Sequence, residues 1–273
     1  MKGIFAVIQS VYRNDKAKYL RQSISSILMQ SYSDFIYYIG IDGFISDDLR
    51  NVLSSFDDDR IRIVENKENK GLAGILNDLL SVVMKGHYEY IARMDSDDIA
   101  LPDRFEKQVR FLEAHPNVDV VGGAIHEIDE KGESRHHVVH YPCSPSQCHA
   151  FFSKRNPLAH PTVMFRRRYF EKTNCFYPTD FIRNEDTRLW HEGYKHGCVI
   201  ANIHDVVLYF RTTDDMFKQR RNGNSFAKSQ LQLRKLIIKD LNYGRMAYVY
   251  AYAMYLLMIS PSWILKTAYK FLR

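Results

Sequence analysis

The sequence predicts an α/β protein built on a mainly parallel sheet that is covered by helices. Over the first hundred residues, short apolar runs alternate with segments of helical periodicity, and a polar or acidic residue follows almost every run. A β-α-β-α-β-α-β series of this kind implies parallel strands joined by helical crossovers. The chain has 273 residues, 45% of them hydrophobic, which is enough for a substantial core and argues against disorder.

The expected strands and helices follow one another in a regular order. In the first half, strands are expected at residues 4–8, 35–41, 61–64 and 90–94, and helices after Asp15, a candidate cap, and from Gly71. In the second half, the pattern indicates helices at 103–115 and 185–197, strands at 118–121, 161–165 and 206–210, and a turn at 129–132. Because ligands of open parallel sheets bind beyond the carboxyl ends of the strands, residues just after the strands are the functional candidates.

Three acids within four positions follow the apolar run at 90–94: Asp95, Asp97 and Asp98. On a strand, Asp95 and Asp97 point to the same face. Two carboxylates about 4 Å apart repel by roughly 4 kcal/mol at an effective dielectric near 20, so such a cluster normally needs a cation. A hard divalent ion, Mg²⁺ or Mn²⁺, would keep positions open for substrate phosphates. The alternative is a solvated acidic turn in which Asp98 or Asp103 caps the next helix.

Charge is unevenly distributed along the chain. The net charge is +6, but residues 214–273 hold eleven lysines and arginines against three aspartates, so this segment carries +8 and the rest −2. A basic tail beside a nearly neutral body suits an anionic membrane surface better than nucleic acid. The apolar run at the start is too short for a signal peptide, which predicts chemistry inside the cell. The four cysteines have no zinc-site spacing and are expected to be reduced thiols.

Five features, in order and spacing, resemble those of one enzyme family. They are Tyr12, Asp42-Gly43, Asn69-Lys70-Gly71-Leu72 with Asn77, the acidic cluster, and Glu185-Asp186. Together they resemble family 2 glycosyltransferases of the GT-A fold. The segments at 156–165 and 209–211 resemble the bacterial branch that makes exopolysaccharide, capsule and O-antigen, including amylovoran-type enzymes. The likeness extends over about residues 3–225.

The resemblance implies a nucleotide-sugar-binding half at 1–100 and an acceptor half at 101–215 of one glycosyltransferase domain. Tyr12 would stack on the base, which for an aromatic side chain is worth ~1–3 kcal/mol, and Asp42 would accept a hydrogen bond from it. The base is usually uracil. Asp97 would bind the metal directly, and Asp95 would contact the ribose or the metal's water shell. Asp98 would lie behind these ligands or cap the next helix.

Further candidates for nucleotide-sugar binding are Lys70, Gly71, Asn77, Arg93, Arg220 and Arg221. Lys70 and Arg93 would balance the acids or touch phosphate, or else be ordinary structural cations. Arg220 and Arg221 would close over the diphosphate, or lie in a solvated loop. The chain departs from the family pattern in two places: Ile41-Asp42 replaces a pair of aspartates, and Leu76 stands where an arginine often precedes Asn77.

Asp186 matches the family's general base. A carboxylate in the first turn of a helix is favoured by the helix dipole, which keeps it ionised, although acids are common at any helix start. Glu185, His160 and Thr162 are candidate acceptor contacts, with packing or a turn hydrogen bond as the alternative for His160 and Thr162. The implied reaction is inverting and metal-dependent: a hexose, glucose or galactose, moves from a UDP-sugar to an undecaprenyl-diphosphate-linked oligosaccharide.

Residues 216–273 are predicted to form a basic helical tail. A helix is expected at 228–241, and residues 246–265 carry no charge but are interrupted by Ser260-Pro261-Ser262 and contain four tyrosines. Tyrosines and cationic flanks favour a helix lying in the cytoplasmic membrane surface. A helix packed on the body or on a homodimer partner, and a membrane span, are the alternatives.

Three other functions compete with a glycosyltransferase. A D-x-D phosphatase would place its acids early in the chain, whereas here three β-α units precede them. A sugar-nucleotide pyrophosphorylase needs a Gly- and Arg-rich loop after the first strand, where this chain has Gln9-Ser10-Val11-Tyr12. A non-catalytic membrane-bound assembly subunit would not need the intact acids.

Overall fold

The computed structural model describes residues 5–181, 183–212 and 224–260. The strands are β1 (Phe5–Tyr12), β2 (Phe35–Asp42), β3 (Ile61–Asn66), β4 (Tyr90–Met94), β5 (Ile99–Ala100), β6 (Val120–Ile128), β7 (Ser134–Val139), β8 (Met164–Arg166) and β9 (Ile200–Arg211). The helices are α1 (Ala17–Leu28), α2 (Asp47–Ser54), α3 (Gly71–Val83), α4 (Arg104–Ala114), α5 (Pro145–Phe152), the 3₁₀ turn η1 (His160–Thr162), α6 (Arg167–Thr173), α7 (Glu185–Lys195), α9 (Asn224–Asp240) and α10 (Arg245–Ile259).

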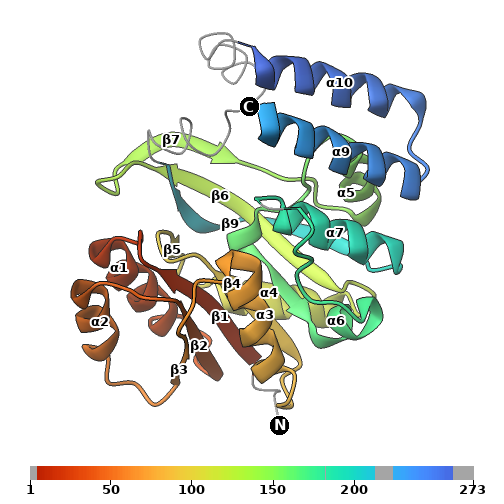
Figure 1. The fold of residues 1–273 in the computed structure, drawn as a ribbon. Helices are drawn as coiled ribbons and strands as arrows, with labels where there is room; N and C mark the ends of the chain where they lie inside the picture. Colours follow the sequence, from red (N-terminus) through yellow and green to blue (C-terminus); the bar gives the residue numbers. More distant parts are fainter. Residues whose placement is uncertain (1–4, 182, 213–223, 261–273) are drawn as a thin grey trace.

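The strands of the described residues form one nine-stranded sheet (Figure 1). Its order is β3-β2-β1-β4-β8-β6-β9-β5, and β7 pairs with β6. The first four of these strands are parallel, as the sequence predicts. Beyond them, β8 is antiparallel to both β4 and β6, so it joins the two halves of the sheet.

The two faces of the sheet carry two hydrophobic clusters. Phe5, Val7 and Val11 of β1 pack with α1, α2 and α4, whereas Ala6 and Ile8 face the opposite cluster. This division follows from the period of two along a strand. The second cluster includes buried residues of α3, α5, α6, α7 and α9. Both clusters are continuous across the nucleotide and acceptor halves expected from the sequence.

Two local predictions are wrong. The predicted strand at 161–165 begins instead as η1, because Pro161 suits the first turn of a helix and the backbone turns back through a Thr162 N–H bond to the Ala159 oxygen (3.0 Å). Asp15 does not cap α1, since Lys16 is the residue at that position. The strands expected at 118–121 and 206–210 are present but much longer, because β6 and β9 pair along their length.

The first tail helix packs against the body of the protein. Leu233 and Ile237 of α9 are fully buried in the second hydrophobic cluster, next to residues that precede position 215. Helix α10 packs on α9 through Ala247 and Ala251, with Ile238 between them. Figure 1 shows these two helices side by side at the top of the molecule, with α10 outermost. Among the described helices, none combines the length and the apolar character that crossing a bilayer requires. Residues 261–265 of the uncharged run lie outside the described residues.

Candidate active site

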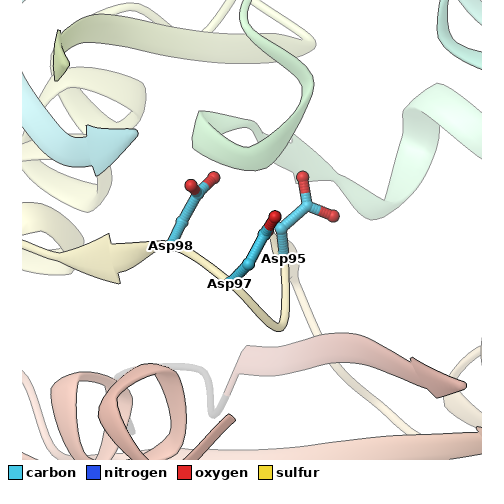
Figure 2. Close-up of side chains that lie close together, drawn as sticks. All are labelled: Asp95, Asp97 and Asp98. Carbon is cyan, nitrogen blue, oxygen red and sulfur yellow. The ribbon is translucent and has the colours of Figure 1, made fainter. Parts of the chain in front are cut away.

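Asp95, Asp97 and Asp98, with Ser96 between them, form a turn after β4 that we call the acid loop (Figure 2). One ligand oxygen from each aspartate lies within 4.8 Å of the others. Burial, and next the charges of the other two aspartates, raise the pKa of Asp98 well above its ordinary value. One Asp98 oxygen accepts the Arg211 backbone N–H (2.8 Å), and its Oδ2 is buried without a hydrogen-bond partner in the described residues.

This donor set fits a divalent cation. Three carboxylates offer the hard oxygen ligands that Mg²⁺ and Mn²⁺ prefer. A bound cation would relieve the repulsion among the three acids and would give the buried Asp98 Oδ2 a partner. Of the two alternatives for Asp98, the cap is not formed, because Asp98 precedes β5 and its carboxylate bonds to the end of β9.

Two arginines from different strands hold the acid loop. Arg93 of β4 is buried and forms an ion pair with Asp95, so it balances the acids as one of its predicted roles requires. Arg211, at the end of β9, donates from Nε to the Asp97 backbone oxygen (2.9 Å) and from Nη2 to Gln22 Oε1 (2.8 Å). Arg211 is buried too, and its contact with this loop was not predicted from the sequence.

Tyr12 and Asp42 are neighbours across β1 and β2, where they pair in register at the carboxyl ends of the strands. Tyr12 is 37% exposed, which leaves its ring available for stacking. Asp42 is buried, and its two oxygens accept the backbone N–H groups of Lys70 (2.7 Å) and Gly71 (3.0 Å). Gly71 has a φ of +75°, a left-handed value that favours glycine. Asp42 thus fixes the start of α3, and a base would have to use its remaining lone pairs.

Two other predicted nucleotide-site residues have partners elsewhere. Lys70 Nζ lies 2.7 Å from Asp78 Oδ2, so it does not balance the acid loop. The Asn77 amide exchanges two hydrogen bonds with the backbone of Tyr177, at 2.9 and 2.7 Å. Asn77 therefore anchors the segment that leads to α7. Arg220 and Arg221 lie outside the described residues.

Asp15 is a residue near this site that the sequence analysis assigned to another role. Its carboxylate accepts the Tyr12 backbone N–H (3.0 Å), and Ser96 of the acid loop bonds to it. Burial, opposed by these hydrogen bonds and aided by the charges of Asp97 and Asp95, raises the pKa of Asp15 to about 7. An acid three residues after Tyr12 is the only sequence signal for this position.

Asp186 lies in the first turn of α7, and its carboxylate accepts three hydrogen bonds. Its Oδ1 accepts the backbone N–H (2.6 Å) and the hydroxyl (3.2 Å) of Thr187, and its Oδ2 accepts Asn156 Nδ2 (2.9 Å). Asn156 also donates to the Thr187 hydroxyl (2.9 Å). Burial raises the pKa of Asp186, while the Thr187 hydrogen bonds and the charges of Arg93 and Arg234 oppose that rise. Arg93 thus acts electrostatically on both the acid loop and Asp186.

The predicted acceptor contacts differ in their surroundings. A ring nitrogen of His160 lies 2.8 Å from the Tyr177 hydroxyl, and burial lowers the pKa of His160 well below its usual value, which keeps the ring neutral. Thr162 has no exposed surface, and its hydroxyl donates to the Ala159 oxygen (2.7 Å) while accepting from Gly123 N–H (3.3 Å). Thr162 cannot contact an acceptor without moving, so the turn hydrogen bond is its supported role. Glu185 is partly exposed and accepts the Arg183 N–H (2.9 Å).

Comparison with solved structures identifies the fold. The UDP complex of Staphylococcus aureus TarS has a TM-score of 0.66 at 16% identity, covering 93% of this chain and 70% of that one. The mannosyltransferase PcManGT from Pyrobaculum calidifontis, in complex with GDP-Man and Mn²⁺, has a TM-score of 0.58 at 17% identity, covering 100% of this chain and 81% of that one. The fold is the GT-A glycosyltransferase fold, as predicted.

Sequence comparison identifies the family. The family described as Glycosyl transferase family 2 matches residues 7–174. An uncharacterized glycosyltransferase of Haemophilus influenzae is 32% identical over 98% of this chain and 99% of its own length. The amylovoran biosynthesis glycosyltransferase AmsE of Erwinia amylovora is 33% identical, covering 85% of each chain. An Escherichia coli enzyme named UDP-Gal:alpha-D-GlcNAc-diphosphoundecaprenol beta-1,3-galactosyltransferase is 25% identical, covering 84% of this chain and 81% of its own.

The chain belongs to glycosyltransferase family 2. It is therefore a glycosyltransferase, which confirms the resemblance and the enzyme class expected from the sequence. The phosphatase and pyrophosphorylase alternatives lose their support with this assignment.

Proposed function

We propose that the protein is an inverting, metal-dependent glycosyltransferase of bacterial cell-surface polysaccharide synthesis. It would transfer a hexose, glucose or galactose, from a UDP-sugar to an undecaprenyl-diphosphate-linked oligosaccharide at the cytoplasmic face of the membrane. The observation that carries this proposal is the pairing of two carboxylate sites around Arg93. This arginine forms an ion pair with Asp95 and also favours the ionised form of Asp186.

The residues divide the reaction between them. Asp95 and Asp97 would hold Mg²⁺ or Mn²⁺, and beside them lies Asp98 Oδ2, which has no hydrogen-bond partner among the described residues. When bound, such an ion stabilises the negative charge that develops on a departing diphosphate. Tyr12 would stack on the base and Asp42 would accept a hydrogen bond from it. Asp186, held by hydrogen bonds from Thr187 and Asn156, would take the proton from the acceptor hydroxyl as that oxygen attacks the anomeric carbon.

The names of the relatives support the finer assignments. AmsE acts in amylovoran biosynthesis by its name, and the Escherichia coli relative is named for UDP-Gal and a diphosphoundecaprenol-linked acceptor. TarS was solved with UDP, and PcManGT with GDP-Man and Mn²⁺. The two structures differ in the base, so uracil rests on TarS and on the named relative.

A screen of nucleotide sugars tests this function directly. The full chain is titrated with UDP-, GDP- and dTDP-hexoses in the presence of Mn²⁺, Mg²⁺ or a chelator, and binding and hydrolysis are both measured. We expect UDP-glucose or UDP-galactose to bind only with a divalent ion. Binding of no nucleotide sugar, or equal binding in the chelator, would overturn the proposal.

The outer face of α10 supports membrane attachment. Five hydrophobic residues on this face recur at helical spacing and are 40% to 73% exposed, and we call them the outer stripe. They are Met246, Val249, Tyr252, Leu256 and Ile259. Exposed cations flank this outer stripe, with Arg245 at the start of α10 and Lys228, Lys235 and Lys239 on the neighbouring helix α9. An apolar stripe bordered by lysines and arginines favours a helix lying in the headgroup region of an anionic bilayer.

The outer stripe has a direct binding test. We expect the wild-type chain to sediment with vesicles containing anionic lipid and to be released by high salt. Val249→Asp/Leu256→Asp should lower the bound fraction at least tenfold, because it places charge in the stripe. Met29→Asp is the matched control, since Met29 is 76% exposed on a different helix end. If the double variant bound normally, or if it only converted a homodimer to a monomer, the membrane proposal would fail.

A further inference from the structure

Helix α9 lies along α7, the helix that carries Asp186. The two helices contact each other through polar groups near both ends of α7. Near the start of α7, Gln230 donates a hydrogen bond to the side chain of Asn184, the residue that precedes the helix. Near its end, His191 Nε2 lies 3.1 Å from Asp240 Oδ2. The buried Leu233 between these contacts belongs to the same hydrophobic cluster as Trp190 of α7.

Between those two contacts, a chain of hydrogen bonds runs from α9 to Asp186. Arg234 is partly buried and donates to the Phe152 backbone oxygen (2.8 Å) and to Asn156 Oδ1 (3.4 Å). Asn156 in turn donates from Nδ2 to Asp186 Oδ2 (2.9 Å). The Arg234 guanidinium also lies over the Phe152 ring, 5.5 Å from its centre, which fixes the plane of the group.

The direction of this chain follows from the chemistry of its members. A guanidinium has only donors and an ionised carboxylate has only acceptors. An amide placed between them must turn its oxygen to the arginine and its nitrogen to the carboxylate. Arg234 therefore selects the orientation of the Asn156 amide in which Asn156 can donate to the base. With the amide reversed, its oxygen would face the carboxylate oxygen and repel it.

Other charged and titratable groups face Asp186, and they define what Arg234 adds. Arg93 of β4 favours the ionised carboxylate, and Tyr177 lies near it in the segment before α7. Arg155, beside Asn156, acts electrostatically on Arg234. Arg93 also pairs with Asp95, so Arg234 is the cation near Asp186 whose described partners are neutral groups. Burial lowers the pKa of Arg234 to about 10, which leaves it charged at neutral pH.

We propose that Arg234 of helix α9 is a positioning residue for the catalytic base: through Asn156 it orients Asp186 and stabilises its ionised form. This inference rests on the proposed function, because it takes Asp186 as the base. Arg234 touches no substrate in this arrangement. The two tail helices then have separate functions. The inner face of α9 positions Asn156 and Asp186, which we call the base site, and α10 carries the outer stripe.

The test compares two variants of Arg234 with a variant of an exposed lysine outside the tail helices. Arg234→Met keeps much of the side-chain length but removes the charge and the donors, whereas Arg234→Lys keeps the charge. Lys85→Met is the matched control, because Lys85 is exposed just after α3 and its loss changes the net charge equally. Full-length proteins are assayed for kcat across pH with saturating donor and acceptor, for donor KM, and for thermal unfolding.

We expect Arg234→Met to move the acidic limb of the kcat profile up by about one pH unit, which lowers kcat about tenfold at pH values below the limb. Its kcat should approach the wild-type value at high pH, with the donor KM unchanged. Arg234→Lys should restore most of the limb's position, and Lys85→Met should behave as wild type. A fall in kcat that is equal at every pH, or an unmoved limb in a folded variant, would overturn the inference.

A separate variant distinguishes this inference from the proposed function. If Asp186→Asn retained normal transfer, Asp186 would not be the base and the proposed mechanism itself would fail. If Asp186→Asn lost activity while Arg234→Met kept the wild-type pH profile, only the role of Arg234 would be disproved.

Discussion

The acid loop and the base site both depend on aspartates, but they are built in different ways. The acid loop comes from four consecutive residues, and one of its cations, Arg93, lies two positions before Asp95. The base site joins Asn156 and Asp186, which come from separate segments, with Arg234 of α9 behind them. One site is therefore contiguous in the sequence, and the other exists only in the folded chain.

The two sites also differ in how their charge is compensated. In the acid loop three carboxylates face one another, and a buried Asp98 oxygen has no hydrogen-bond partner in the described part of the chain. At Asp186 both oxygens accept hydrogen bonds from protein groups. The first arrangement suits a bound cation, whereas the second suits the role proposed for Asp186, a single carboxylate that accepts a proton.

Asp97→Asn should have the largest effect on this difference. Loss of the charged ligand removes metal stabilisation of the departing diphosphate, worth several kcal/mol, so transfer should fall about a thousandfold at 1.36 kcal/mol per tenfold. Sugar transfer and divalent-ion binding are both measured. Asp57→Asn, at an exposed aspartate between α2 and β3, is the control and should behave as wild type. Normal transfer by Asp97→Asn would show that the acid loop holds no catalytic metal.

Asp186→Asn should have the next largest effect, and a different kind of effect. The amide keeps the shape of the side chain but cannot take a proton, so kcat should fall at least a hundredfold, within the usual range for a general base. Donor affinity and the metal requirement should stay nearly unchanged, because Asp186 is not part of the acid loop. Isothermal titration with the donor analogue UDP separates the two quantities. Loss of metal-dependent UDP binding in this variant would mean that the two sites are not independent.

The acid loop could be predicted from the sequence better than the site around Asp186, because its residues are contiguous along the chain. The acid loop, the pairing of Tyr12 with Asp42, and the start of α3 at Gly71 were visible because each depends on neighbouring residues or on the end of a strand. The α/β fold and the family were predicted correctly for the same reason. Local sequence carries the strand-to-helix transitions that place such residues.

What could not be predicted depends on tertiary contacts. Arg211 reaches the acid loop only because β9 pairs with β5, which follows that loop. Arg234 is one of several cations on α9, and the helical period of the sequence does not show that this one contacts Asn156. Asp15 is a residue type that often caps a helix, but its carboxylate instead accepts a hydrogen bond from the Tyr12 backbone N–H. In each case the partner is chosen by the fold and not by spacing along the chain.

The pH dependence of transfer should report on the base site more than on the acid loop. Burial raises the pKa of Asp186, and a general base works only when deprotonated, so kcat should be full above that raised pKa and fall about tenfold per pH unit below it. Burial also raises the pKa of Asp15, to about 7, so a limb near that pH has two candidate groups. Asp15→Asn should keep the limb in kcat. Disappearance of the limb in Asp15→Asn would assign it to the donor side of the site.

Asp98→Asn should have the smallest effect and should define the boundary of the metal site. Asp98 Oδ1 accepts the Arg211 N–H, so an asparagine would keep its oxygen there and turn its NH₂ group to the position of the unpaired Oδ2. A donor would then face the cation in place of an acceptor. We expect the metal concentration for half-maximal activity to rise about tenfold, roughly 1.4 kcal/mol, while kcat at saturating metal stays within about threefold. A metal titration of transfer measures both values. An unchanged metal requirement would mean that Asp98 is protonated and only supports the loop, which leaves Asp95 and Asp97 as the ligands.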